Sequence, residues 1–164
     1  MFDLRAATHD DIARAAACAE EAYRPYISRM GKRPAPMDAD FAAHHRNGEL
    51  EIIEWKDASE GSGKAAWAGY AVTILTPNTL FIDNIALLDA FRGRGIARML
   101  FEALTVRARS HGCVALELYT NAKMTENLAL YPRLGFRETD RRVENGFDRV
   151  FFQKDVGEGS DDGQ

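Results

Sequence analysis

The apolar residues of this chain change their spacing repeatedly, and that change limits the possible folds more than any other feature. Apolar residues spaced three or four positions apart predict a helix, whereas alternation or short β-branched and aromatic runs predict a strand. Helical spacing is clearest over residues 12–23 and 96–111, and strand-like runs dominate residues 50–87 and much of the sequence after 113. The resulting order, β-α-α-β-β-β-α-β-α-β-β, predicts a mixed α/β fold with a mostly antiparallel sheet of about six to seven strands and about four helices.

Local signals suggest several element boundaries. Thr8-His-Asp-Asp is close to a capping box and predicts the start of the first helix. Residues 23–37 contain three prolines and a glycine, so we expect them to be largely loop. Asp38 is expected to cap a second short helix that Gly48 ends, and Asn145-Gly146 favours a tight hairpin.

The length of 164 residues suits one domain with one core, which we place at residues 1–155. Residues 156–164, "VGEGSDDGQ", combine Gly, Ser and acidic residues, and we expect them to form a disordered acidic tail that buries nothing. The polar, glycine-rich stretch 56–64 is expected to be a hairpin loop between two strands.

Composition points away from several classes of partner and location. The chain holds 21 basic and 25 acidic residues, a net charge of −4, which argues against binding to nucleic acid or to an anionic membrane. No apolar stretch approaches the roughly 18–20 residues that a spanning helix needs, and the first residues lack a secretory signal pattern. Cys18 and Cys113 occur in unrelated contexts, which favours two buried, reduced thiols and a cytoplasmic protein.

The stretch "DAFRGRGIARML", residues 89–100, places glycines and arginines where a helix begins. A helix start leaves backbone N–H groups unpaired and carries partial positive charge, while glycine lets a backbone approach a phosphate closely. Neither the P-loop pattern nor the dinucleotide pattern G-x-G-x-x-G fits, because Arg98 stands at the third glycine position of the latter. The glycine spacing alone leaves two interpretations open, a phosphate cradle and a solvated basic turn.

Several motifs in order resemble the GNAT N-acetyltransferase superfamily. Arg92-x-x-Gly95-x-Ala97 is similar to the family's Arg/Gln-x-x-Gly-x-Gly/Ala signature, and "NLALYPRLGF" resembles its later "ALYxxxGF" element. The strand "DNIALLDAF" looks like the one that leads into the signature loop, so that the resemblance covers roughly residues 2–155.

The resemblance implies acetyl-CoA as co-substrate, with no metal. Its pyrophosphate would bind the backbone amides of the turn, and its pantetheine arm would bind backbone groups of the strand "NIAL" where that strand splays from "ALEL". Asn127 is expected to contact the CoA arm, because Met124 stands where many relatives carry Asn; an exposed helix residue is the alternative. The cofactor-binding residues expected on this basis are Ile85, Leu87, Arg92, Gly93, Arg94, Gly95, Ile96, Ala97, Arg98 and Asn127.

The same resemblance implies a catalytic acid and leaves the base open. Tyr131 matches the family tyrosine that protonates or hydrogen-bonds the CoA sulfur, although a tyrosine there also suits a core or rim aromatic. Pro132 is expected to end or bend the helix at Tyr131. Asp83, in partly dry surroundings, is the first candidate base. Glu117 and Tyr119, on one face of the next strand, are rivals, and a reaction without a single base is also open.

Residues 23–37 are the expected source of acceptor specificity. Tyr23, Tyr26, Arg29 and Met30 would wall an acceptor pocket or else pack on the sheet, and Lys32 and Arg33 would favour an acceptor bearing a carboxylate.

Three classes of function follow from these features. The first is an N-acetyltransferase acting on a primary amine of a small molecule or peptide, by direct attack in a ternary complex. The second is an acyl-CoA-binding regulatory module with little or no catalysis. The third is a protein that binds RNA through "RGRG", which fits poorly with the net negative charge of the chain.

The apolar "RVFF" of residues 149–152 would suit an edge contact between two copies of the chain.

Overall fold

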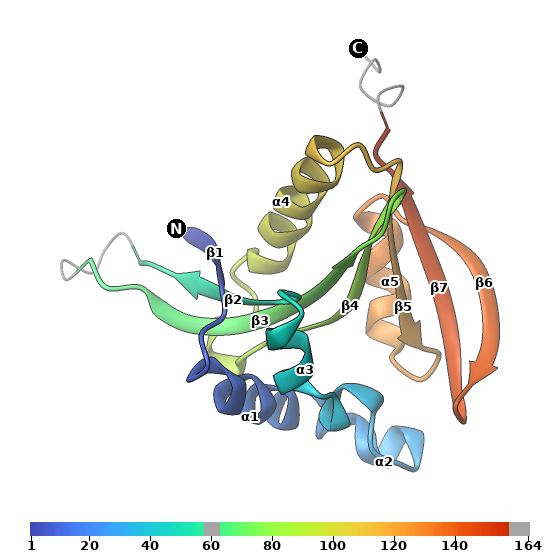
Figure 1. The fold of residues 1–164 in the computed structure, drawn as a ribbon. Coiled ribbons are helices and arrows are strands. Elements are labelled where there is room, and N and C mark those ends of the chain that lie inside the picture. The colour runs from blue at the N-terminus through green and yellow to red at the C-terminus, as the bar shows by residue number, and fades with distance from the viewer. Residues whose placement is uncertain (58–62, 158–164) are drawn as a thin grey trace. The chain divides into compact units, whose positions relative to one another are not determined.

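The computed structural model describes residues 1–57 and 63–157, and most of the loop expected at 56–64 lies outside them. The described chain forms one seven-stranded sheet with strand order β1-β2-β3-β4-β5-β7-β6, together with five α-helices, as Figure 1 shows. The expected mixed α/β class is confirmed. The strands are β1 (Phe2–Ala6), β2 (Leu50–Trp55), β3 (Ala66–Leu75), β4 (Thr79–Leu87), β5 (Ala115–Asn121), β6 (Arg137–Glu144) and β7 (Phe147–Asp155). The helices are α1 (Asp11–Tyr23), α2 (Tyr26–Met30), α3 (Phe41–Arg46), α4 (Ile96–Ser110) and α5 (Thr125–Arg133), with 3₁₀ turns η1 (Ala35–Asp38) and η2 (Asp89–Phe91).

Contacts divide the chain into two compact units, residues 1–73 with 84–100, and residues 74–83 with those after 100. In the first unit, β1, β2 and β3 pair antiparallel, and α1 lays a stripe of small residues on the core. Its buried members are Ala15, Cys18, Ala19 and Ala22, packed with Phe41, Tyr70 and Val72 among others. Small side chains let a helix approach its neighbours closely.

The start of α1 is held by a buried carboxylate. Asp11 accepts hydrogen bonds from the Thr8 N–H at 2.8 Å and from the Arg5 guanidinium at 2.7 Å. The Trp67 Nε1–H donates to it at 3.1 Å. One half of the expected capping box is present: the Thr8 N–H donates to the Asp11 carboxylate, whereas the Asp11 N–H donates to the Thr8 carbonyl and not to its hydroxyl. The Asp11 carboxylate also ties α1 to β1 and β3.

Residues 23–37 differ from the expected loop. They contain α2 and most of η1, because Pro25 and Pro34 precede these turns at positions where a missing N–H costs nothing. The expected cap of the next helix, Asp38, instead lies in η1. Asp40 caps α3, since its Oδ1 accepts from the Ala43 N–H at 3.0 Å.

In the second unit, β4 pairs parallel with β5, and β7 pairs antiparallel with both β5 and β6. Asn145 and Gly146 both have positive φ and close the predicted hairpin between β6 and β7. Residues 149–152 lie in β7, whose two hydrogen-bonding edges are both used. The suggested edge contact between copies through this segment is therefore wrong.

The C-terminal end of the described chain also departs from expectation. Val156 is 0% exposed, its N–H donates to the Val114 carbonyl at 2.8 Å, and its own carbonyl accepts from Arg109. The expectation that residues 156–164 bury nothing is thus wrong for Val156, and residues 158–164 lie outside the described chain. Cys18 and Cys113 are both buried and free, as expected. Within the described ranges, no helix is long and apolar enough to cross a membrane.

Candidate active site

The turn before α4 presents a run of unpaired backbone donors. Gly93 and Gly95 have φ values of 78° and 76°, in the left-handed region that favours glycine. The first amide of α4 with a backbone partner is that of Met99, which donates to the Gly95 carbonyl at 3.2 Å. Among the residues described, the six N–H groups of residues 93–98 have no hydrogen-bond partner. Six neighbouring donors at a helix N-terminus form an anion-binding arrangement.

The side chains of this turn keep it open and positive. A Cβ added at either Gly93 or Gly95 would meet nothing within 4 Å, so the backbone there is accessible. The exposed Arg92 contacts Asp89 at 3.4 Å, and the Arg94 guanidinium lies 5.3 Å from the centre of the Phe91 ring. Ile96 is buried and anchors the helix, whereas Arg98 is exposed. This arrangement leaves room for an anion, and the binding of a phosphate at the turn stays a prediction.

The end of β4 directs alternate backbone groups to opposite sides. The Leu88 N–H donates to the Ala68 carbonyl of β3 at 2.9 Å. Because strand residues alternate, Ile85 and Leu87 direct their N–H and C=O groups away from β3. The register of β4 against β5 ends at Ile82 with Leu118, so both residues lie beyond it. A role of these backbone groups in binding the pantetheine arm stays a prediction.

One contact at this strand was not anticipated from the sequence. The hydroxyl of Tyr23, the last residue of α1, donates to the Ile85 carbonyl at 2.6 Å. Tyr23 also packs near Tyr26, with ring centres 6.4 Å apart, and the Arg29 guanidinium lies over the Tyr26 ring at 4.9 Å. The residues expected to wall an acceptor pocket thus include one that touches β4 directly.

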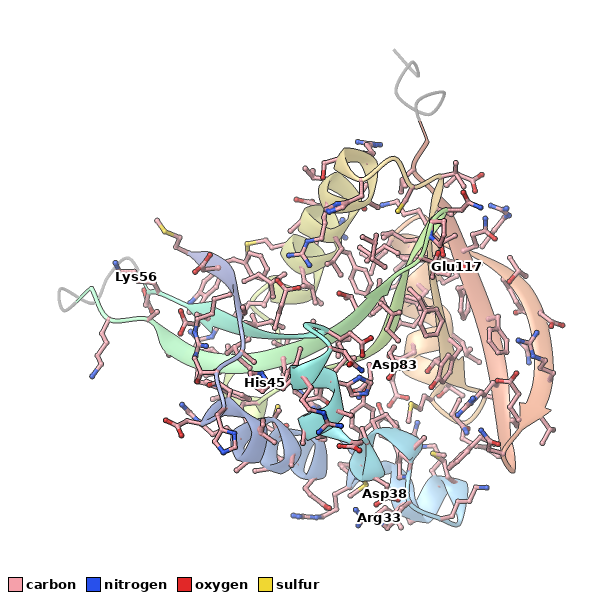
Figure 2. All side chains as sticks on the ribbon, in the orientation of Figure 1. Arg33, Asp38, His45, Lys56, Asp83 and Glu117 are labelled. Atoms are coloured by element: carbon pink, nitrogen blue, oxygen red, sulfur yellow. The ribbon has the colours of Figure 1, made fainter. Side chains whose placement is uncertain are left out.

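Arg33 is less suited to its expected role of attracting an acidic acceptor. Its guanidinium contacts Glu20 at 2.6 Å and Asp38 at 3.1 Å, and Figure 2 labels Arg33 and Asp38 side by side near α2. Two carboxylates therefore already neutralise this charge.

The candidate bases come together on one face of the second unit. Phe81 of β4 is in register with Glu117 of β5, so Asp83 and Tyr119, each two residues further on, share that face. The Phe81 and Tyr119 rings stack with centres 5.8 Å apart. Figure 2 labels Asp83 and Glu117 on these two strands. The predicted shared face of Glu117 and Tyr119 extends to Asp83.

Charge on this face is unevenly balanced. Burial, and then the negative charge of Asp83, raise the pKa of Tyr119. The Arg149 guanidinium lies 4.3 Å from the centre of the Tyr119 ring and pairs with Glu144 at 3.0 Å. Glu117 is half-buried, and its side chain has neither a hydrogen bond nor an ion pair within the described part of the chain. Both carboxylates remain candidate bases, and the neutral phenol of Tyr119 is a weaker one.

Tyr131 lies on the opposite, helix-covered face of the same strands. Its buried ring packs against Phe152, Phe101 and Phe136, with ring centres 5.5, 5.9 and 5.8 Å away. Phe152 is in register with Leu118, which points away from the face of Glu117 and Tyr119. Three aromatic neighbours hold the ring in place, so both readings of Tyr131, as an acid and as a core aromatic, are compatible with this packing.

Pro132 was expected to end or bend the helix at Tyr131. The helix does not end there, because α5 continues to Arg133. Proline removes one N–H donor in the last turn, but the Tyr131 carbonyl still accepts from the N–H groups of Leu134 and Phe136, both at 3.0 Å.

Asn127, expected to contact the CoA arm, makes a local contact. Its Nδ2 donates to the Thr120 hydroxyl at 3.0 Å, which links α5 to β5. A role of Asn127 in cofactor binding stays a prediction.

Comparison with known proteins identifies the family of this chain. The model of the acetyltransferase (GNAT) family matches residues 16–136. The [ribosomal protein bS18]-alanine N-acetyltransferase of Salmonella typhimurium is 40% identical over 77 residues, which cover 46% of this chain and 51% of that protein. The chain spans about half the length of the curated relatives it matches first.

Solved structures share the fold. A GNAT acetyltransferase from Streptococcus agalactiae superposes with a TM-score of 0.72 at 21% identity, covering 94% of this chain and 95% of that one. A GNAT acetyltransferase from Elizabethkingia anophelis with acetyl-CoA bound gives a TM-score of 0.55 at 22% identity, covering 72% and 84%. With the family model matched over most of its length, this chain belongs to the GNAT acetyltransferase family.

Proposed function

We propose that the protein transfers the acetyl group of acetyl-CoA to a primary amine of a small molecule or peptide, by direct attack in a ternary complex. The observation that carries the proposal is the run of six unpartnered amides at residues 93–98, among the residues the structure describes. Arg92, Arg94 and Arg98 add positive charge there in an acidic protein. A pyrophosphate satisfies such donors with charge-assisted hydrogen bonds.

The N–H of Ile85 and the backbone groups of Leu87 would receive the pantetheine arm, since both residues lie beyond the register of β4 with β5. An added strand binds an open edge in this way. The Ile85 carbonyl already accepts the Tyr23 hydroxyl. An N–H from this segment would also polarise the thioester carbonyl, and one such donor contributes about 3 kcal/mol to transition-state stabilisation.

Two side chains on opposite faces of the strands in the second unit would carry out the proton transfers. The neutral amine attacks the carbonyl carbon, the C–N bond forms, and the C–S bond breaks. Asp83, on the face it shares with Tyr119, would take the proton that the amine nitrogen loses, directly or through water. Tyr131, on the other face, would give a proton to the departing thiolate. Acid and base are thereby kept apart and cannot neutralise each other.

Substitution of Gly95 tests the cradle. In Gly95→Glu a carboxylate would occupy the expected pyrophosphate position, and acetyl-CoA affinity should fall at least 100-fold in a calorimetric titration. The matched control is Gly112→Glu at the other end of α4, because Gly112 has the same φ of 76° and equally open surroundings.

Two results would contradict the proposal. Equal loss of affinity in both variants would mean that backbone strain, and not the lost anion site, is responsible. Tight binding of acetyl-CoA without thiol release for any amine, amino acid or peptide tested would favour the CoA-binding module instead.

A further inference from the structure

The chain that leads from β4 to the turn at residues 93–98 is attached to the last turn of α1. Oε2 of Glu21 accepts a hydrogen bond from the Asp89 N–H at 2.9 Å, across 68 positions of the sequence. Asp89 is the first residue of η2, and the residue before it, Leu88, has no polar side chain that could cap this turn. A distant helix therefore supplies the acceptor that the first amide of η2 needs.

Neighbouring contacts hold the same stretch of chain. The Tyr23 hydroxyl, two residues after Glu21, donates to the Ile85 carbonyl at 2.6 Å. The Leu88 side chain packs on the apolar cluster to which the buried face of α1 belongs, and the Leu88 N–H donates to β3 at 2.9 Å. All of these residues lie in the first unit. The chain ahead of η2 is thereby fixed against α1 and β3.

The turn itself has few contacts that could define its shape. A Cβ added at Gly93 or Gly95 would meet nothing within 4 Å, and glycine has wide conformational freedom. The directions of the amides at residues 93–98 therefore depend on what holds the two ends of the turn. The buried Ile96 anchors the end at α4.

Asp89 transmits the attachment to the other end. Its carbonyl accepts the Arg92 N–H at 3.2 Å, and its carboxylate contacts the Arg92 guanidinium at 3.4 Å. The backbone just ahead of the turn and one of the cationic side chains beside it thus both depend on where Asp89 lies. Glu21 fixes that position from α1.

The charge of Glu21 is the opposite of the charge that an anion site attracts. A carboxylate near a bound pyrophosphate repels it, so electrostatics alone disfavours an acidic residue here. We propose that Glu21 is a positioning residue for acetyl-CoA, an inference that rests on the proposed function. Its hydrogen bond orders the chain ahead of the turn, so that the amides of residues 93–98 are aimed at the pyrophosphate before the cofactor binds. Order present before binding lowers the entropic cost of binding.

Three variants separate this hydrogen bond from the charge, with acetyl-CoA affinity measured by calorimetric titration. Glu21→Ala should weaken binding about fivefold, which corresponds to the net contribution of one hydrogen bond, although the loss of a negative charge would by itself tighten it. Glu21→Gln keeps an oxygen acceptor and should bind at least as tightly as the wild type. The matched control is Glu20→Ala, because Glu20 is the preceding residue and pairs with Arg33 at 2.6 Å. It should lose no affinity.

A second measurement needs no cofactor. In NMR spectra of the free protein, the amide resonances of Asp89, Gly93 and Gly95 should move further in Glu21→Ala than in Glu21→Gln, and should stay in place in Glu20→Ala. Unchanged or tighter binding of acetyl-CoA by Glu21→Ala, an equal loss in Glu20→Ala, or unmoved glycine resonances would overturn the inference. A wild type that bound no acetyl-CoA would instead refute the proposed function, and the glycine resonances would still decide whether Glu21 positions the turn.

Discussion

Replacement of Asp11 by alanine should destabilise the protein markedly without touching the proposed chemistry. Asp11 is 4% exposed and accepts hydrogen bonds from Arg5, Thr8 and Trp67. The substitution leaves the Trp67 Nε1–H without this acceptor and removes the acceptor of the Thr8 N–H at the start of the helix that carries Tyr23. The first unit therefore loses the link between β1, α1 and β3.

The magnitude follows from these contacts. Removing one partner of a buried ion pair costs about 3–5 kcal/mol, but the Arg5 side chain is one-third exposed and keeps Glu54 at 2.8 Å. We therefore expect a loss of about 3 kcal/mol in the free energy of unfolding, in the lower part of that range. For a domain of this size that corresponds to a fall in Tm of about 6 to 12 °C.

The effect should also depend on pH. The Arg5 guanidinium holds the pKa of Asp11 well below its usual range. A carboxyl whose pKa is lowered in the folded state adds stability above its unfolded pKa of about 3.9 and loses it as the pH falls below that value. The difference between wild type and variant should be constant from about pH 5 to pH 7 and shrink below about pH 4.

Urea denaturation followed by circular dichroism measures this difference, because Trp67 fluorescence would itself change. Asp10→Ala is the matched control: Asp10 is exposed and its side chain makes no cap hydrogen bond. A loss below 1 kcal/mol at pH 7, or a difference between wild type and variant that does not change down to pH 3, would refute the reasoning.

Three further substitutions test other parts of the molecule. Tyr131→Phe keeps the ring among its aromatic neighbours and should lower kcat at least tenfold with unchanged acetyl-CoA affinity; equal kcat would remove the hydroxyl from the mechanism. Asp83→Asn should lower the pKa of Tyr119 in an ultraviolet titration, because a neighbouring negative charge is removed; Glu117→Gln, the control on the same face, should not. Gly69→Ala should cost more than about 3 kcal/mol in urea denaturation, because its Cβ would lie 2.2 Å from the Ala86 carbonyl oxygen, whereas Gly48→Ala, which meets no such contact, should cost less.

Local patterns in the sequence predicted much of the fold because they depend on near neighbours. The apolar spacing of 96–110 predicts α4, Asn145-Gly146 predicts the β6–β7 turn, and both are present. The turn at residues 93–98 was also readable, since glycines before a helix determine a local run of open amides. Errors arose where two local signals competed. The prolines of residues 23–37 predicted a loop, yet they stand where short helical turns tolerate them.

Other features of the site join residues far apart in the chain. Tyr23 reaches the Ile85 carbonyl, and Glu21 reaches the Asp89 N–H, across separations that no periodicity encodes. Likewise, the register of β4 with β5 decides that Asp83 shares a face with Tyr119, while the packing of α5 puts Tyr131 on the other. The sequence alone determined the order of elements and the phosphate turn, because these depend on local backbone preferences and spacing. Only the tertiary structure decided which polar groups face one another, because burial and pairing between distant strands and helices fix their directions.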